Sequence, residues 1–194
     1  MLIEISGMQK AGKSTLIEGL TFNHRMYKFP MGGVCKEFGV KPTWELQIAK
    51  DISTMELYKQ LLDVIHDDHL PTIADRGPLS TIFYTLLFNR ASEEDVEKFI
   101  KYLSQYPFWW PVWTEGINQP EITREKTDGF DSLQDGLDPN QVKIIKQKMF
   151  GLLTKYGIPY TIYYNDFAKP ISENQELFAS MILEVIAKAR GDAE

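Results

Sequence analysis

The stretch GMQKAGKS, from Gly7 to Ser14, follows directly on a short apolar run. Its spacing fits G-x-x-x-x-G-K-[ST], the pattern of phosphate-binding loops. Glycine allows the backbone angles that let successive N–H groups curl around an anion, and a helix that follows adds its positive N-terminal end. In such a loop Lys13 reaches the β- and γ-phosphates, and the Ser14 hydroxyl ligates Mg²⁺. The sequence therefore predicts a site for a nucleoside triphosphate.

A second candidate group is the pair Asp75-Arg76, which follows the short strand-like stretch at residues 71–74. In open parallel sheets, ligands bind at the carboxyl ends of the strands. An aspartate at such a position can hold the water shell of a magnesium ion, and an arginine can grip a phosphate with two hydrogen bonds. We therefore predict a metal role for Asp75 and a phosphate role for Arg76. The alternative is an ordinary surface turn.

A third group is the charged segment TREKTDGFD at residues 123–131. Phosphoryl transfer requires that water is excluded and that charge on the moving oxygens is neutralised. Arg124 and Lys126 suit this task, and we expect a small lid over about residues 121–138. The alternative is a solvated charged loop.

Composition limits the class of protein. The chain has 194 residues, of which 43% are apolar and 25% charged, and its net charge is −6. We expect one domain, residues 1–194, with no membrane span and no signal peptide. Cys35 is the single cysteine, so we expect no intrachain disulfide and a cytoplasmic location. The negative charge disfavours broad binding to a nucleic-acid backbone.

Strand-like and helix-like stretches alternate along the chain, which favours an α/β fold with a parallel sheet and helices on both faces. The expected strands are near residues 2–5, 25–29, 71–74, 108–116 and 159–164. The expected helices begin near residues 14, 43, 78, 93, 139 and 172. We also expect helix caps at Ser92 and Asp138 and a capping box from Ser172 with Gln175. A helix break is expected at Ser53-Thr54, and an edge or an interruption of a strand at Pro111.

In this order, the three groups resemble the thymidylate kinase family, within the wider group of deoxynucleoside and nucleoside monophosphate kinases. The resemblance spans nearly the whole chain and rests on the segments GMQKAGKST, YKFPMGG, DRGPLSTIFY, PEITREKTDGFD and NDFAKP. It implies a three-layer P-loop NTPase fold with a small lid, ATP and Mg²⁺ as cofactors, and a homodimer. The implied reaction is phosphoryl transfer from ATP to a deoxynucleoside monophosphate, with dTMP as the best candidate.

The resemblance also implies roles for single residues. The catalytic residues would be Lys13, Lys10, Arg124 and Arg76. The ATP-binding residues would be Gly7, Met8, Gln9, Lys10, Ala11, Gly12, Lys13, Ser14, Thr15 and Ala168. The acceptor-binding residues would be Gln9, Lys28, Phe29, Trp44 and Arg76. The metal would be held by Ser14 and Asp75.

Three departures from the family pattern concern the acceptor. Gln9 stands where the family has an aspartate that meets the acceptor's sugar, and Gly77 replaces an aromatic residue. The segment WELQIAKDI, residues 44–52, lacks the arginine that reads thymine, which leaves Trp44 or Gln47 for the base. Three alternatives therefore stay open. They are a kinase of free deoxynucleosides or other small hydroxyl compounds, which needs a carboxylate base near the acceptor, a non-catalytic nucleotide-binding module, and a kinase of modified bases within DNA.

Overall fold

The computed structural model describes residues 1–28, 43–64, 70–119 and 137–191. Five parallel strands form one sheet in the order β2-β3-β1-β4-β5. The strands are β1 (Leu2–Gly7), β2 (Arg25–Tyr27), β3 (Thr72–Asp75), β4 (Trp109–Ile117) and β5 (Thr161–Asp166). The helices are α1 (Lys13–Glu18), α3 (Trp44–Val64), α4 (Pro78–Leu87), α5 (Glu93–Leu103), α6 (Pro139–Lys155) and α7 (Ile171–Arg190). The predicted α/β class with a parallel sheet is confirmed.

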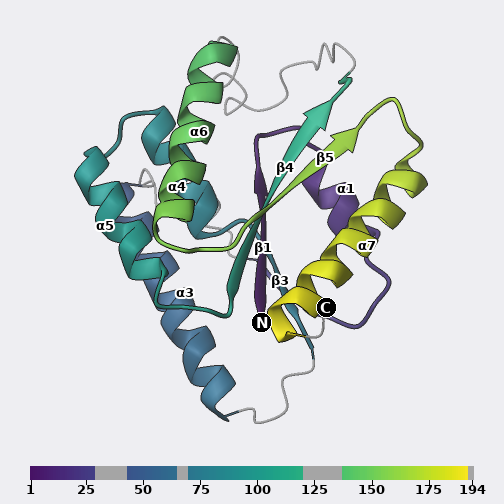
Figure 1. The fold of residues 1–194 in the computed structure, drawn as a ribbon, viewed down its shortest axis with the longest axis horizontal. Coiled ribbons are helices and arrows are strands. Elements are labelled where there is room, and N and C mark those ends of the chain that lie inside the picture. Colours follow the sequence, from purple (N-terminus) through teal and green to yellow (C-terminus); the bar gives the residue numbers. More distant parts are fainter. Residues whose placement is uncertain (29–42, 65–69, 120–136, 192–194) are drawn as a thin grey trace, which may run out of the picture.

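Helices cover both faces of the sheet, which gives three layers (Figure 1). The helices α3, α4, α5 and α6 lie on one face, and α1 and α7 lie on the other. Ile3 and Ile5 of β1 pack in the core with Phe178 of α7, whereas Leu2 packs in the opposite core with Phe83 of α4. Since side chains alternate along a strand, the even-numbered residues of β1 face α4. Two of these even-numbered residues, Glu4 and Ser6, are polar, and both are fully buried.

The predicted break in α3 is wrong, because the helix runs unbroken through Ser53 and Thr54. Each hydroxyl donates to a backbone carbonyl one turn earlier, Ser53 Oγ to Ala49 O at 2.7 Å and Thr54 Oγ1 to Lys50 O at 2.9 Å. Such back-bonding satisfies the hydroxyl inside a helix, so neither residue has to end it.

The predicted interruption at Pro111 is also wrong, since β4 is continuous and lies between β1 and β5. Pro111 pairs with Glu4 of β1, but the pairing with β5 begins only at Val112. At Pro111 the strand therefore has a neighbour on one side only, where a missing N–H is tolerated.

The predicted helix caps had mixed outcomes. Ser92 caps α5 and Asp138 caps α6 as predicted, each accepting a hydrogen bond from a backbone N–H of the first turn. The capping box at α7 is wrong, because the helix already begins at Ile171 after Pro170 and has no side-chain cap. Gln175 Nε2 instead donates to Thr15 O at 2.8 Å, which joins α7 to α1.

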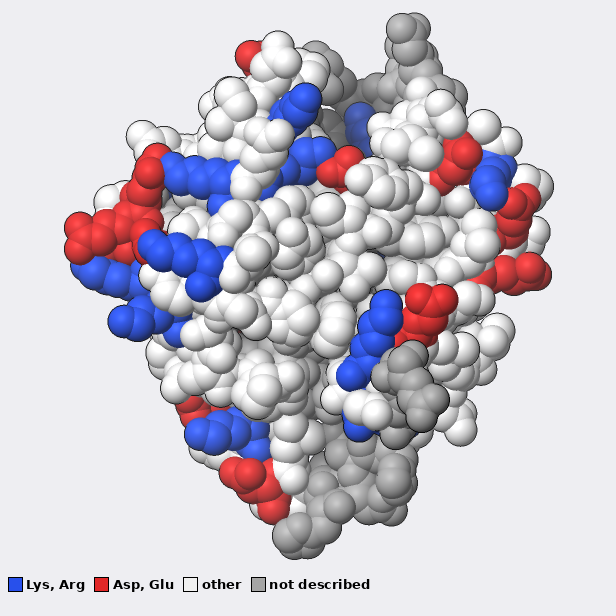
Figure 2. Space-filling view, in the orientation of Figure 1, with Lys and Arg blue, Asp and Glu red and all other residues white. Residues whose placement is uncertain are grey.

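Across the described ranges, no helix is long and apolar enough to cross a membrane. The face shown in Figure 2 carries lysine and arginine side chains interspersed with aspartate and glutamate, rather than one continuous basic stripe. Ion pairs also join α5 and α6, among them Lys155 with Glu97 at 2.5 Å. Cys35 and nearly all of the predicted lid lie outside the described residues.

Candidate active site

The loop between β1 and α1 has the backbone form that its glycines predict. Gly12 is left-handed, with φ 81°, and Gly7 has φ 146°. An added Cβ at Gly12 would lie 2.3 Å from Asn165 Nδ2, and one at Gly7 would lie 2.3 Å from Thr114 O. These contacts come from the neighbouring strands β5 and β4. Both glycines are therefore required by close packing as well as by backbone angle.

Lys13 lies at the start of α1 with 7% of its surface exposed. Its Nζ donates to Met8 O at 2.6 Å and to Gly7 O at 3.2 Å, so the ammonium group bridges the loop that precedes it. The pKa of Lys13 is lowered to about 8, mainly by burial and also by the nearby charge of Arg76, whereas Asp75 opposes both effects. A phosphate bound in the loop would restore the full charge of this lysine, because an anion favours the protonated form.

The rest of the loop is held by hydrogen bonds from β5 and from the segment that follows β4. Asn165 Nδ2 donates to Ala11 O at 3.1 Å, and Gln119 Nε2 donates to Lys10 O at 3.1 Å. Lys10 itself is left-handed, with φ 65°. Ser14 and Thr15 follow on the exposed side of α1. These two bonds tie the main chain of the loop at Lys10 and Ala11 to β5 and to the segment after β4.

The turn between β5 and α7 lies against the same loop. The ring of Phe167 on this turn would lie 3.5 Å from an added Cβ at Gly12. Ala168 comes next along the chain, and its N–H donates to Asp166 Oδ1 at 3.0 Å. The structure therefore places Ala168 on a turn that borders the phosphate loop.

Asp75 and Arg76 lie at the carboxyl end of β3, directly beside the end of β1. Asp75 is in register with Ile5 of β1, and Arg76 N donates to Ile5 O at 3.1 Å. The backbone of Arg76 is left-handed, with φ 71°, and its side chain is exposed. Lys28, just beyond β2, pairs with Asp75 through a 3.2 Å contact between Nζ and Oδ2. The structure thus gathers Lys13, Lys28, Asp75 and Arg76 at the ends of three adjacent strands.

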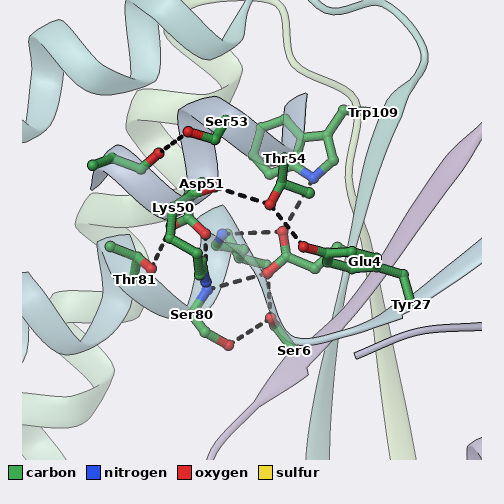
Figure 3. Close-up of polar contacts among 12 residues, drawn as sticks. Glu4, Ser6, Tyr27, Lys50, Asp51, Ser53, Thr54, Ser80, Thr81 and Trp109 are labelled. Atoms are coloured by element: carbon green, nitrogen blue, oxygen red, sulfur yellow. Dashed lines mark hydrogen bonds and ion pairs between the residues drawn. The ribbon is translucent and has the colours of Figure 1, made fainter. Parts of the chain in front are cut away.

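A small pocket opens beside Arg76, between α3 and the turn that follows β3. It is lined by Leu2, Glu4, Tyr27, Lys50, Asp51, Thr54, Ala74, Arg76, Gly77, Pro78 and Trp109. Asp51 is 1% exposed and lies 2.5 Å from Lys50 Nζ, and Thr81 Oγ1 donates to its other oxygen at 2.6 Å. Burial raises the pKa of Asp51. A cation and a carboxylate therefore stand side by side in the wall of this pocket (Figure 3).

Sequence reasoning did not assign Lys50 and Asp51 to the site, although both lie within residues 44–52, the segment expected to contact the base. Trp44, which was assigned, is 8% exposed and packs edge-on against Phe99 of α5 at 5.7 Å between ring centroids. This packing favours a core role for Trp44, and its predicted contact with the acceptor base stays a prediction. Phe29, Arg124 and Lys126 lie outside the described residues.

Sequence reasoning also missed Glu4, which lines the pocket and has a fully buried side chain. Burial raises the pKa of Glu4 to about 7, against the opposing effect of its hydrogen bonds. The available signal was a charged residue inside a short strand that is otherwise apolar. Such a residue needs buried partners, and the sequence alone does not say where they come from.

The oxygen atoms beside the loop fit the ligand preference of a magnesium ion that is bound together with a nucleotide. Mg²⁺ prefers oxygen ligands and usually keeps several waters, so one or two protein oxygens with the phosphates suffice. The Ser14 hydroxyl and the Asp75 carboxylate supply such oxygens next to the loop. Within the described ranges, no cluster of three or more histidine, cysteine, aspartate or glutamate residues is positioned to hold a metal by itself.

No model of a protein family matches the sequence, and no curated protein matches it. Among solved structures, a thymidylate kinase from Candida albicans aligns with a TM-score of 0.54 and 18% identity, over 97% of this chain and 92% of that one. A deoxyadenosine kinase from M. mycoides, with the products dCMP and dCDP bound, aligns with a TM-score of 0.52 and 17% identity, over 95% of this chain and 100% of that one. The chain therefore has the α/β fold of the P-loop nucleotide and nucleoside kinases. The predicted resemblance is confirmed at the level of the fold.

Proposed function

We propose that this protein transfers the γ-phosphoryl group of Mg·ATP to a deoxynucleoside monophosphate, with dTMP as the first candidate. The observation that carries the proposal is the gathering of Lys13, Asp75 and Arg76 at the adjoining carboxyl ends of β1 and β3. A phosphate loop alone would bind a nucleotide. A second cation beside it gives a second phosphate a place to bind.

On the donor side, the loop from Gly7 to Thr15 would surround the ATP phosphates with N–H groups. Lys13 would leave its carbonyl partners for the β- and γ-phosphates. Ser14 would ligate Mg²⁺ and Asp75 would orient its waters, and the ion would neutralise phosphate charge. The adenine would lie near the turn that carries Ala168, because that turn borders the loop.

On the acceptor side, Arg76 and Lys28 would hold the phosphate of the monophosphate, since both cations flank the end of β3. The nucleoside would enter the pocket beside Arg76. There Lys50 offers a hydrogen-bond donor and Asp51 an acceptor, which suits neighbouring groups such as O4 and N3–H of thymine. Gln9 would meet the sugar, and Phe29 stays a predicted contact.

The chemistry requires positioning and neutralised charge more than covalent help. An oxygen of the acceptor's phosphate attacks the γ-phosphorus of ATP in line with the bond to the leaving ADP. Lys13 would stabilise the charge that develops on the transferring group. Lys10 in the loop and Arg124 in the predicted lid are the further cations proposed for this task.

A free deoxynucleoside is a second candidate acceptor, because Asp51 is a carboxylate in the same pocket as Arg76. A hydroxyl acceptor needs a base of this kind, whereas a phosphate oxygen does not. Asp51→Asn distinguishes the two acceptors. It should lower kcat with an unphosphorylated nucleoside by about a hundredfold or more, but it should change mainly the KM with a monophosphate.

The experiment that tests the proposal is an assay of ADP release from Mg·ATP with a panel of nucleosides and nucleoside monophosphates. Lys13→Met should lower turnover by about a hundredfold or more, and Lys101→Met, which removes a lysine from the last turn of α5, should not. Turnover with unphosphorylated nucleosides only would replace the first candidate by the second. Nucleotide binding without turnover of any acceptor would favour a non-catalytic module.

A further inference from the structure

Glu4 is a charged side chain enclosed near the centre of the molecule. It lies on β1 just ahead of the phosphate loop, and 0% of its surface is exposed. Taking a carboxylate out of water is strongly unfavourable unless donors replace the lost hydration. The structure supplies those donors.

Four donors converge on the two oxygens of this carboxylate (Figure 3). Ser6 Oγ at 2.5 Å and Ser80 N at 3.2 Å donate to Oε1. Leu79 N and Trp109 Nε1, each at 3.1 Å, donate to Oε2. Because a carboxylate has about four lone-pair sites, these bonds leave none for a substrate proton. Glu4 is therefore an acceptor for the protein's own groups rather than a general base.

Two of the four donors are free backbone amides in the first turn of α4. The residue that precedes the helix is Gly77, which has no side chain to cap them. Glu4 supplies the missing acceptors from another strand and places an anion at the positive end of the helix. An added Cβ at Gly77 would lie 3.0 Å from Oε2 of Glu4. The glycine after Asp75-Arg76 thus leaves room for this carboxylate.

The next two residues of β1, Ile5 and Ser6, also bond to the segment between β3 and α4 and to the start of α4. Ile5 O accepts the N–H of Arg76 at 3.1 Å, and Ser6 Oγ lies 2.7 Å from Ser80 Oγ. Three consecutive residues that lead into the phosphate loop are therefore bonded to the segment that carries Arg76.

We propose that Glu4 is a positioning residue that fixes Arg76 and the start of α4 relative to the phosphate loop. The proposal rests on the proposed function in one respect, namely that Arg76 binds the acceptor. Through this anchor, one strand sets the distance between the donor phosphates and the acceptor phosphate.

The surroundings of Glu4 also make the anchor sensitive to pH. Among the described residues, the charged groups that line the same pocket are Asp51 and Lys50 from α3 and Arg76 from the turn after β3, whereas β4 contributes the neutral indole of Trp109. The pKa of Glu4 is raised to about 7, mainly by burial and also by the nearby charge of Asp51. Protonation of the Glu4 carboxylate would place an O–H donor among the four groups that donate to it. The anchor should therefore weaken as the pH falls below that value.

The test compares wild type with Glu4→Gln, which keeps the shape but brings an amide NH₂ among the donors. We expect kcat/KM for dTMP to fall about ten- to hundredfold, while the affinity for Mg·ADP measured by calorimetric titration stays within about twofold. Hydrogen exchange at the amides of Leu79 and Ser80 should accelerate. Wild-type kcat/KM should fall below about pH 7, and the variant should lack this dependence.

Tyr58→Phe is the matched control. It also removes a partly buried side-chain hydrogen bond near β1, which Tyr58 Oη donates to Met1 O at 2.6 Å, but this bond does not involve Glu4 or α4. It should leave the acceptor kinetics and the exchange at Leu79 unchanged. If Glu4→Gln does not fold, Trp109→Phe removes one of the four donors and should give the same pattern in weaker form.

Two results would overturn the proposal. One is a folded Glu4→Gln variant with unchanged acceptor kinetics and unchanged exchange at Leu79 and Ser80. The other is a loss of Mg·ADP affinity as large as the loss in kcat/KM. A wild-type protein that phosphorylates no acceptor would refute the proposed function instead, and the amide exchange would still test whether Glu4 anchors α4.

Discussion

Lys28 Nζ lies 3.2 Å from Asp75 Oδ2, so a cation just beyond β2 is paired with the carboxylate that ends β3. The lysine side chain is 69% exposed, whereas that of Asp75 is 11% exposed. Lys28 is therefore free to move toward a ligand, while Asp75 stays fixed in the sheet. The pair connects the proposed metal residue with the proposed acceptor residues.

Lys28→Met should raise the KM for dTMP about two- to fivefold and change kcat little, because an exposed cation contributes about 1 kcal/mol at most. Steady-state kinetics with varied dTMP measure this effect. Lys98→Met is the control, since Lys98 is similarly exposed and pairs with Glu94 on the surface of α5. An unchanged KM for dTMP in Lys28→Met would remove Lys28 from the acceptor site.

Gly12→Ala should abolish nucleotide binding, because the added methyl group would lie 2.3 Å from Asn165 Nδ2 at a left-handed position. Gly157→Ala is a matched control, since Gly157 also has a left-handed φ of 65° but nothing lies within 4 Å of an added Cβ. Both variants should lose roughly 1 kcal/mol of stability from backbone strain. Only Gly12→Ala should lose affinity in a titration with Mg·ADP, and equal affinities would contradict the close packing at Gly12.

The buried Glu4 should make the free energy of unfolding depend on pH. Its pKa is raised to about 7 from the ordinary value of 4.5, so the folded state keeps a proton that the unfolded state loses between these values. The resulting stabilisation is fully present below the unfolded pKa and is lost as the pH rises through the folded pKa. At about 1.4 kcal/mol for each pKa unit, its upper limit is about 3 kcal/mol.

Urea denaturation of wild type and Glu4→Gln across this pH range measures the effect. Asp51 contributes with the same sign, because burial raises its pKa as well, and it is present in both proteins. The difference between the two stability curves should therefore change between about pH 5 and pH 8. A difference that is constant over this range would contradict the raised pKa of Glu4.

Arg124→Ala should lower kcat by about tenfold or more with little change in the KM for ATP, as expected for the loss of a transition-state cation. Lys10→Met tests the other proposed cation in the same assay. If Arg124→Ala leaves kcat unchanged, the lid residue has no part in the mechanism and the role falls to Lys10.

The sequence predicts those parts of the site whose chemistry is local. The phosphate loop is contiguous, so its spacing alone indicates its backbone form and the role of Lys13. Asp75-Arg76 is recognised for a similar reason, since a strand-like stretch precedes it and strand ends gather ligands. The fold class follows from the alternation of elements in the same way.

The missed residues depend on partners that are remote in sequence. Glu4 takes hydrogen bonds from Leu79 and Trp109, which lie 75 and 105 residues further along the chain. Asp51 is bonded to Thr81, 30 residues away on another helix. No local pattern indicates such contacts, because they exist only after α3 and α4 have packed on the sheet.

The most direct test of the central claim is to identify the product formed from γ-labelled Mg·ATP and dTMP by the wild-type protein. We expect label in thymidine diphosphate, about a hundredfold less of it with Lys13→Met, and none with thymidine in place of dTMP. Label that appears only as inorganic phosphate, or that is transferred to thymidine but not to dTMP, would contradict it.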